Sequence, residues 1–214
     1  MPRIDPFEKF ADAYQEWFLR HPHAYRAELE AIRRLWPEGA AGMEVGVGAG
    51  HFAAALGIRI GVDPSARMRR LAASRGIRVL DGAAEALPFG DGVFDAVLMV
   101  TTLCFVDDPD RAVEEIRRVL RPGGVVVVGL VDADSPLGRE YRARRHRSRF
   151  YAAARFFTVS EVAGLLVRHG FVNLALCQTL FTHPGRMDRP DPVREGHGQG
   201  AFVVIRGQRE EADA

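Results

Sequence analysis

The stretch Met43–Gly50, MEVGVGAG, ends in three glycines at alternate positions, directly after a short apolar run. Glycine lets the chain bend sharply after a strand, and such a bend presents backbone N–H groups at the start of the following helix, where a nucleotide-like ligand can bind. Asp63, in the sequence GVDPS, ends the next apolar run roughly 20 residues further on, where an acid can bind a pair of ribose hydroxyls. The glycines and the acid together indicate an adenosine-containing cofactor.

Strand patterns and helix patterns alternate around this stretch. Apolar runs predict strands over residues 42–46, 58–62, 77–80, 94–100 and 125–131. Helix patterns lie between most of them, and the proline–glycine stop at Arg121–Gly124 separates the last helix from the last of these strands. Strands that alternate with helices imply a parallel sheet covered by helices on both faces.

The last third of the chain has a different character. Thr158–Glu161, TVSE, is a capping box that begins a helix ending at His169. Residues 172–181 and 201–206 have strand patterns with no helix pattern between them, so these two strands should pair antiparallel. Residues 208–214 are polar and predict a frayed tail. We therefore expect an α/β fold, a Rossmann-like doubly wound sheet of seven mostly parallel strands with an antiparallel C-terminal hairpin.

Residues 5–36 read as two helices ahead of the first strand. In the first of these helices the aromatic residues fall at helical spacing, and they are Phe7, Phe10, Tyr14, Trp17 and Phe18. Such a stripe can face the core, or it can form an aromatic lid over a ligand, and the two interpretations are compatible. Residues 1–36 are therefore predicted to be a helical lid segment packed on the rest of the chain.

Composition excludes several classes of protein. The 214 residues are most simply one domain, and a formal net charge of +1 gives no overall attraction to nucleic acid or membranes. Lys9 is the only lysine, so neither a P-loop nor a Schiff-base site is available. Cys104 and Cys177 show no metal-ligand spacing. The N-terminus lacks an apolar signal core and no run approaches membrane-spanning length, so a cytoplasmic location is expected.

Four stretches, taken in order, resemble the motifs of class I S-adenosylmethionine-dependent methyltransferases: MEVGVGAG, GVDPS, GAAEALPFGDGVFDAVLMV and RVLRPGG. The LPF…FD part is most similar to the small-molecule group, methyltransferase type 11, that includes the ubiquinone/menaquinone-biosynthesis type. The resemblance runs from about Asp5 to Arg206. It implies S-adenosyl-L-methionine as the cofactor and a cofactor-binding methyltransferase domain over residues 37–207.

The resemblance assigns the methionine part and the ribose of the cofactor to the first two motifs. Glu44 resembles the acid at the end of the first strand of the family, and Asp63 resembles the acid that binds both ribose hydroxyls. The bend under the methionine part consists of Gly46, Val47, Gly48 and Gly50.

The adenine is assigned to the next positions. Pro64 and Met68 are expected near the ring, and Ala84 and Glu85 lie where the family holds the adenine edge, largely through backbone groups. Ala83 is a departure, because family members often have an aspartate there that accepts a hydrogen bond from the adenine amino group. Adenine recognition is therefore expected to be weaker, or to use different contacts.

Val100, Thr101 and Thr102 end the fourth predicted strand, where the resemblance places the sulfonium and its methyl group. Methyl transfer from a sulfonium is an in-line displacement with an activated leaving group, so the protein mainly aligns the acceptor and excludes water. The sequence therefore names no catalytic base. His51, just after the glycine bend, can either face the pocket or begin the helix, and Tyr14 on the lid can touch either cofactor or substrate.

Absent motifs favour a small-molecule acceptor. There is no NPPY-like tetrapeptide, no Pro–Cys pair and no appended RNA-binding module, so no nucleic acid is expected as substrate. The segment Arg139–Arg155 concentrates basic residues, and a helix there would place Arg142, Arg145 and Arg149 on one face. This face is a solvated surface, a site for a carboxylate or phosphate of an anionic acceptor, or a contact to RNA or membrane. The candidate lid or substrate contacts are Tyr14, Trp17, Thr102, Arg142 and Arg145.

Two other functions stay open on the sequence alone. A nicotinamide-dependent oxidoreductase can share this fold, although the glycines read GxGxG rather than GxGxxG and Lys9 leaves no Tyr-xxx-Lys pair. A protein that binds S-adenosylmethionine without catalysis is the second alternative, since no base is evident. Neither the acceptor nor the oligomeric state is indicated.

Overall fold

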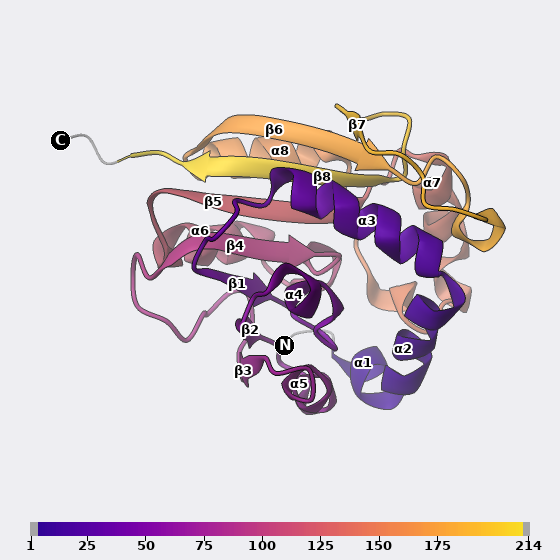
Figure 1. Cartoon of the computed structure of the whole chain (residues 1–214), viewed down its shortest axis with the longest axis horizontal. Coiled ribbons are helices and arrows are strands. Elements are labelled where there is room, and N and C mark those ends of the chain that lie inside the picture. Colours follow the sequence, from indigo (N-terminus) through magenta and orange to yellow (C-terminus); the bar gives the residue numbers. More distant parts are fainter. Residues whose placement is uncertain (1–3, 212–214) are drawn as a thin grey trace.

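An eight-stranded sheet forms the centre of the molecule in the computed structural model, which describes residues 4–211 (Figure 1). The strands lie in the order β3-β2-β1-β4-β5-β8-β6-β7. Their bounds are β1 Gly42–Val45, β2 Ile60–Val62, β3 Arg78–Leu80, β4 Phe94–Val100, β5 Leu120–Val131, β6 Phe171–Thr179, β7 Arg194–Glu195 and β8 Phe202–Arg209.

The strand directions follow the prediction. The strands β1 to β5 pair in parallel, and β8 pairs antiparallel with both β5 and β6. The doubly wound, mostly parallel sheet with an antiparallel C-terminal end is therefore confirmed. The count of seven strands was one too low, because the polar loop before β8 folds back and adds the two-residue strand β7 to the edge of β6.

Helices cover both faces of the sheet. They are α1 Asp5–Lys9, α2 Ala11–Arg20, α3 Pro22–Leu35, α4 His51–Leu56, α5 Ala66–Ala73, α6 Pro109–Val119, α7 Pro136–Arg144 and α8 Val159–Arg168. Figure 1 shows α3, α4 and α5 on one face and α6 and α8 on the other. Within residues 4–211 none of these helices has the length and apolarity that crossing a membrane requires.

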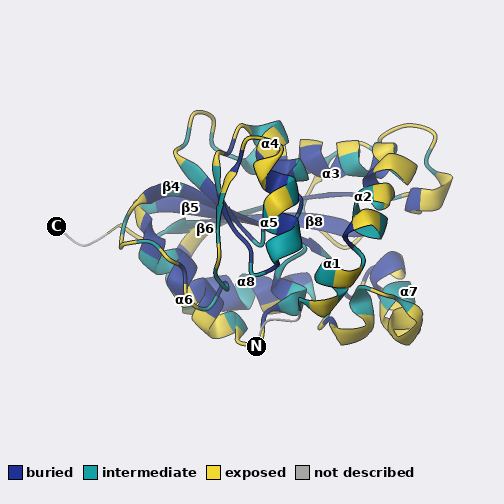
Figure 2. Ribbon diagram, turned by 90° about the horizontal axis from the view of Figure 1, so that it is seen from below, coloured by how far each residue is buried: buried dark blue, intermediate teal, exposed yellow. Residues whose placement is uncertain are grey.

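The two faces of the sheet build two hydrophobic cores. On β5, Val126 packs in the cluster that includes residues of α6 and α8, and Val127 packs in the cluster that includes residues of α3 and α4. Successive side chains of a strand point to opposite faces, so an unbroken apolar run is what a strand buried on both sides requires. Figure 2 shows the result, with most of β4, β5 and β8 buried.

The N-terminal segment forms three helices instead of the two predicted. Phe10 has non-helical backbone angles, φ −122° and ψ 29°, and separates α1 from α2. Its ring lies against Phe150 and under the guanidinium of Arg149, so contacts with a distant segment accompany the break. Figure 1 shows α1, α2 and α7 beyond the end of the sheet toward which β4 points, which is where ligands bind in open α/β folds.

The basic segment 139–155 is not the single helix that its arginine spacing suggested. Helix α7 ends at Arg144, and two short 3-10 turns follow, Arg145–Arg147 and Tyr151–Ala153. The hydroxyl of Ser148 accepts hydrogen bonds from the backbone N–H groups of Phe150 and Tyr151, which favours a new turn over continuation of the helix. Arg149 therefore leaves the helix that carries Arg142.

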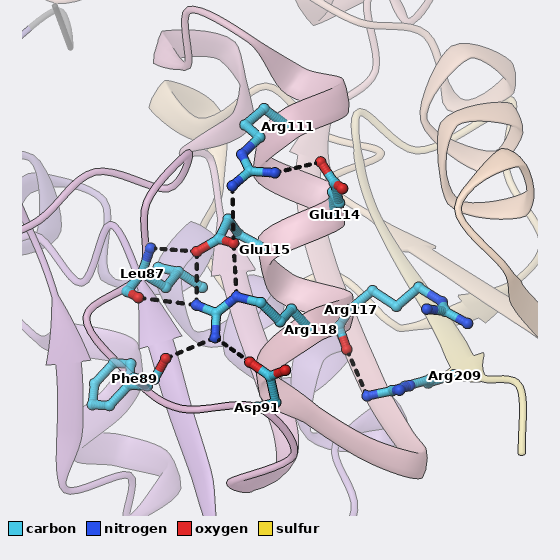
Figure 3. A network of polar contacts seen from close by, with 9 residues as sticks. All are labelled: Leu87, Phe89, Asp91, Arg111, Glu114, Glu115, Arg117, Arg118 and Arg209. Atoms are coloured by element: carbon cyan, nitrogen blue, oxygen red, sulfur yellow. Dashed lines mark hydrogen bonds and ion pairs between the residues drawn. The ribbon is translucent and has the colours of Figure 1, made fainter. Parts of the chain in front are cut away.

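The loop between β3 and β4 is fastened to α6 (Figure 3). Glu115, which is buried, accepts a hydrogen bond of 2.8 Å from the backbone N–H of Leu87. Arg118 donates to Glu115 and to the carbonyls of Leu87 and Phe89, and it pairs with Asp91 at 2.7 Å. The hydrogen bond from Arg118 lowers the pKa of Glu115, so the pair is ionised at neutral pH. This network holds one wall of the site described below.

The predicted tail begins later than residue 208. Strand β8 continues through Arg209, where Gln208 pairs with Val125 of β5. The Arg209 guanidinium donates to the carbonyl of Arg117 at 2.9 Å, as Figure 3 shows, and to that of Leu120. These carbonyls lie where α6 gives way to β5, and the pairing of Gln208 and Arg209 with β5 and β6 extends the strand. The last part of the predicted tail, residues 212–214, lies outside the described residues.

Candidate functional site

The glycine bend after β1 adopts a backbone that favours glycine at every alternate position. Gly46, Gly48 and Gly50 have φ values of +66°, +53° and +81°. A Cβ atom on Gly46 would collide with the side chain of Thr102, and one on Gly48 would lie 3.3 Å from the hydroxyl of Tyr14. The bend therefore needs both the torsional freedom of glycine and its lack of a side chain.

The backbone N–H groups of the bend are mostly used inside the protein. Those of Gly46 and Val47 donate to the carbonyl of Val62, and that of Gly50 donates to Val47. The N–H of Gly48 donates to the carboxylate of Asp63 at 2.8 Å. The expectation of free donors is therefore wrong at these four positions, because the bend closes onto the neighbouring strand β2. What it offers a ligand is a surface without side chains.

Asp63 points toward the bend, at the end of β2. Its second carboxylate oxygen accepts from the backbone N–H of Ser65 at 2.8 Å, and only 7% of the residue is exposed. Burial raises the pKa of Asp63 to about 6, against the opposing effect of the N–H groups of Ser65 and Gly48. Further hydrogen bonds donated to a carboxylate in this environment stabilise its ionised form.

A cavity of about 100 Å³ lies between the bend and Asp63. It brings together most of the positions that the sequence assigned to the cofactor: Gly46, Gly48, Asp63, Pro64, Ala84, Glu85, Val100 and Thr101. Tyr14 and Thr102, predicted as lid or substrate contacts, line it too. Sequence reasoning missed Phe105 and Val106, which follow β4 and carried no motif.

Four predicted cofactor positions do not line this cavity, and the structure gives three of them a packing role. Met68 is buried among Ala11 and Ala49. A Cβ on Gly50 would lie 2.5 Å from the side chain of Ile77, so this glycine lets the bend approach the residues after α5. Val47 is buried in the cluster that includes residues of α3 and α4, and Glu44, the fourth position, is buried as well.

Glu44 is a buried acid with an unsatisfied atom. Burial raises its pKa well above the usual range, although the backbone N–H of Ala53 forms a hydrogen bond that opposes the shift. Its Oε2 atom has no hydrogen-bond partner within residues 4–211. Buried polar atoms of this kind are rare and indicate a site with unmet bonding capacity.

Thr101 is strained at the end of β4. Its φ of +48° is unusual for a β-branched residue, and strain of this type costs about 1–3 kcal/mol and concentrates at functional sites. The neighbouring Thr102 hydroxyl donates to the carbonyls of Val100 and, at 3.3 Å, Gly46. Thr101 lines both the first cavity and the second cavity described below.

Around the predicted adenine position, Ala83 lines the cavity with a methyl group. The nearby Asp81 faces away, because it pairs with Arg69 at 2.7 Å. The carboxylate of Glu85 accepts from the backbone N–H of Asp107 at 2.8 Å and fixes the loop after β4. Side-chain recognition of an adenine amino group is therefore not supplied by these three residues.

The N-terminal helices cover the first cavity. Phe7 and Tyr14 line it, and their helices are held in place by polar contacts to α5. The carboxylate of Glu8 accepts hydrogen bonds from the Ser65 hydroxyl at 2.8 Å and from the backbone N–H of Arg67 at 3.2 Å. These contacts connect the start of the chain to the residues that follow Asp63.

A second cavity of about 470 Å³ adjoins the first. Four residues line both cavities: Phe7, Tyr14, Thr101 and Phe105. Most of the remaining lining is aromatic or aliphatic, including Trp17, Tyr141 and Tyr151, and its single acid is Glu28. Sequence reasoning missed Glu28, although an acid among the buried residues Ala24, Ala27, Ala31 and Ile32 of α3 was a signal that could have identified it.

The predicted basic contacts divide between two places. Arg142 and Arg145 line an open depression with Arg139, away from both cavities. Arg149 lines the second cavity, but its side chain is exposed. His51 lines neither cavity, because it stacks on Phe18 with ring centroids 3.8 Å apart. Burial lowers the pKa of His51 to about 4, so its ring is neutral at pH 7.

Comparison with known proteins identifies the class of enzyme. Residues 43–128 match the family described as "Methyltransferase domain". A solved S-adenosylmethionine-dependent methyltransferase of Thermotoga maritima, described as a possible histamine N-methyltransferase, is 50% identical, with a TM-score of 0.95 over 97% of this chain and 100% of that one. The chain is also similar to an uncharacterised protein of Methanocaldococcus jannaschii, at 40% identity over 96% of this chain and 100% of that protein. It is similar to an uncharacterised protein of Mycobacterium tuberculosis at 38% identity, over 96% of this chain and 74% of that protein.

The protein is therefore a methyltransferase, and it belongs to the class I S-adenosylmethionine-dependent methyltransferases. Its cofactor is S-adenosyl-L-methionine. The residues fit this molecule, because a nearly buried carboxylate at Asp63 faces a side-chain-free surface at Gly46 and Gly48. The nicotinamide-dependent alternative is thereby overturned.

Proposed function

We propose that the enzyme methylates a small-molecule acceptor bound in the second cavity, with S-adenosyl-L-methionine bound in the first. The observation that carries this proposal is the contact between the two cavities, which share Tyr14 and Thr101 among their lining residues. An acceptor atom on one side of this junction can face a methyl group on the other. A cavity of about 470 Å³, lined mostly by apolar groups, has the size and character typical of small-molecule sites.

The proposed cofactor contacts follow the lining of the first cavity. Asp63 accepts hydrogen bonds from the ribose hydroxyls, and the bend at Gly46 and Gly48 lies against the methionine part. Pro64, Ala84 and Glu85 flank the adenine. Val100 and Thr101 are the other proposed contacts to the cofactor. Glu44, Val47, Gly50 and Met68 support these residues from behind.

The chemistry requires alignment more than acid–base catalysis. The bound cofactor supplies an activated methyl group on a sulfonium, and the protein has to hold the acceptor in line and exclude water. The strained Thr101 and the ring of Tyr14 define the junction where the acceptor must approach. Burial raises the pKa of Tyr14, so its hydroxyl stays protonated and can donate a hydrogen bond.

The helical segment 1–36 is proposed to act as a lid over domain 37–207. The first cavity holds about 100 Å³ with α1 and α2 in place, which is less than the roughly 300–1,000 Å³ typical of ligand sites. Displacement of Phe7 and Tyr14 would enlarge it. The name of the Thermotoga relative makes an amine nitrogen one candidate for the acceptor atom, beside oxygen acceptors. A nucleic acid substrate is not expected, and a cytoplasmic location remains a prediction.

The test combines binding with turnover. S-adenosylhomocysteine should raise the melting temperature of the protein, whereas a nicotinamide dinucleotide should not. Incubation with S-adenosylmethionine and a panel of small amines, phenols and carboxylates should then release S-adenosylhomocysteine with at least one acceptor. Binding without turnover across a wide panel would favour the non-catalytic alternative.

A further inference from the structure

Glu28 is a buried acid without a polar partner among the described residues. It lies on α3, is 6% exposed and lines the second cavity. Within residues 4–211 no hydrogen-bond donor and no cation contacts its side chain, and burial alone raises its pKa to about 8. An unpaired buried acid is costly for stability, so a group of this kind is retained where it serves a ligand.

The surroundings of Glu28 are aromatic. Tyr14, Tyr141 and Tyr151 line the same cavity, and each lies near enough that the charge of Glu28 contributes to raising the pKa of its phenol. Trp17 adds a further aromatic side chain to the lining. Aromatic faces attract cations, and more strongly where water is excluded.

The other charged and titratable groups of the cavity do not neutralise Glu28. Arg20 and Arg149 line the cavity with exposed side chains, and within the described part of the chain neither forms an ion pair with Glu28. His21 is the remaining titratable residue of the lining besides the tyrosines. Glu28 thus lies among neutral aromatic rings, while the arginines of the lining are exposed to solvent.

From this arrangement we infer that the acceptor is a basic amine with an apolar, ring-sized body, whose ammonium group binds the carboxylate of Glu28. The ammonium supplies the donors that the acid lacks, and the body packs among Trp17, Tyr141 and Tyr151. The inference rests on the proposed function, because it places the acceptor in the second cavity. It also favours a cationic acceptor over an anionic one, which was one of three interpretations of the basic segment, since Arg142 and Arg145 lie outside this cavity.

Binding should be accompanied by proton release. The acid is largely protonated in the free enzyme at pH 7, and an ammonium group favours its ionised form, so the proton leaves as the amine binds. A neutral glutamine at this position cannot show this linkage. Proton release therefore separates a carboxylate that binds the amine from one that only supports the fold.

The experiment uses three compounds with one ring and different ends: tyramine (amine), tyrosol (hydroxyl) and 4-hydroxyphenylacetate (carboxylate), with histamine as a second amine. Titration calorimetry is done on the full chain saturated with S-adenosylhomocysteine, in buffers of different ionisation enthalpy. We expect an amine to bind at least tenfold more tightly than its uncharged and acidic counterparts, with proton release at pH 7. In Glu28→Gln the preference and the proton release should both disappear.

Glu30→Gln is the matched control, because Glu30 lies on the same helix and is exposed. It should behave like the wild type. If neither amine binds at millimolar concentration, or if Glu28→Gln binds amines as the wild type does, the inference is wrong. A wild-type protein that does not bind S-adenosylhomocysteine would contradict the proposed function instead. Should Glu28→Gln fold poorly, Glu28→Asp serves as the second variant and should retain weakened, proton-linked binding.

Discussion

The carboxylate of Asp63 accepts a hydrogen bond of 2.8 Å from the backbone N–H of Gly48, and this contact joins the end of β2 to the bend after β1. Both groups line the same cavity. Two motifs that are separate in the sequence therefore form one site, in which the acid is oriented by the backbone of the bend. The proposed hydrogen bonds from the ribose hydroxyls to Asp63 depend on this orientation.

Replacement of Asp63 by asparagine should weaken cofactor binding. The amide keeps the size of the side chain but loses the charge, and a hydrogen bond to a charged group contributes about 1.5–3 kcal/mol. We expect the Kd for S-adenosylhomocysteine, measured by calorimetry, to rise about 10- to 100-fold. Asp81→Asn, at an exposed acid paired with Arg69, should leave the Kd unchanged. Equal effects of both changes would contradict the role of Asp63.

Cofactor affinity should also depend on pH. The pKa of Asp63 is raised to about 6, so the carboxylate is ionised at pH 7.5 and becomes protonated as the pH falls below 6. Protonation removes an acceptor, and affinity for S-adenosylhomocysteine should fall by up to about tenfold per pH unit below that value. The decline should be absent in Asp63→Asn. A flat profile in the wild type would show that the charge of Asp63 does not contribute to binding.

Substitution at the bend should separate backbone strain from loss of space. Gly48 and Gly39 both have positive φ values, of +53° and +73°, but a Cβ on Gly39 would meet nothing within 4 Å. Alanine at either position should lower the unfolding free energy by about 1–2 kcal/mol. Only Gly48→Ala should also weaken S-adenosylhomocysteine binding, by roughly tenfold or more, because its methyl group faces Tyr14 and the cavity. Similar binding by both variants would exclude Gly48 from the cofactor site.

Weakening the attachment of α1 should speed cofactor entry. Glu8→Gln removes a charged acceptor of the Ser65 hydroxyl and of the Arg67 N–H. If the N-terminal segment is a lid, the association rate of S-adenosylhomocysteine, followed by stopped-flow fluorescence of Trp17 and Trp36, should increase several-fold. The control is Glu16→Gln, whose carboxylate pairs, among the described residues, with the exposed Arg20. An unchanged rate in Glu8→Gln would mean that α1 does not limit entry.

The pH dependence of the unfolding free energy should include a contribution from Glu28. Its pKa is raised from 4.5 to about 8 on folding. Between these values the folded protein keeps a proton that the unfolded chain releases, so this residue makes stability fall as the pH rises through the window. The full difference is on the order of 5 kcal/mol. Urea unfolding from pH 5 to 9 should show a less negative slope for Glu28→Gln than for the wild type. Identical slopes would contradict a neutral, buried Glu28.

Several features could be predicted because they depend on neighbours in the sequence. The capping box is complete, with Glu161 and Thr158 each bonded to the backbone of the other. The antiparallel pairing of β6 with β8 followed from the absence of a helix between them. The positions around Asp63 and Thr101 were assigned from the resemblance to the methyltransferase motifs, and the structure brings them together at the edge of the sheet where the parallel strands end.

Other features depend on contacts between distant segments, and the sequence alone did not determine them. The break at Phe10 accompanies packing against Phe150 and Arg149, which no local pattern expresses. Met68 and Gly50 carry motif positions, yet packing decides that they lie behind the cavity. Glycine torsions, helix caps and the alternation of strands with helices are expressed by neighbouring residues, so the sequence itself determined the cofactor bend and the mostly parallel sheet. Which side chains enclose the acceptor, Glu28 among them, was decided only when α2, α3 and α7 packed together, because burial and desolvation are properties of the assembled structure.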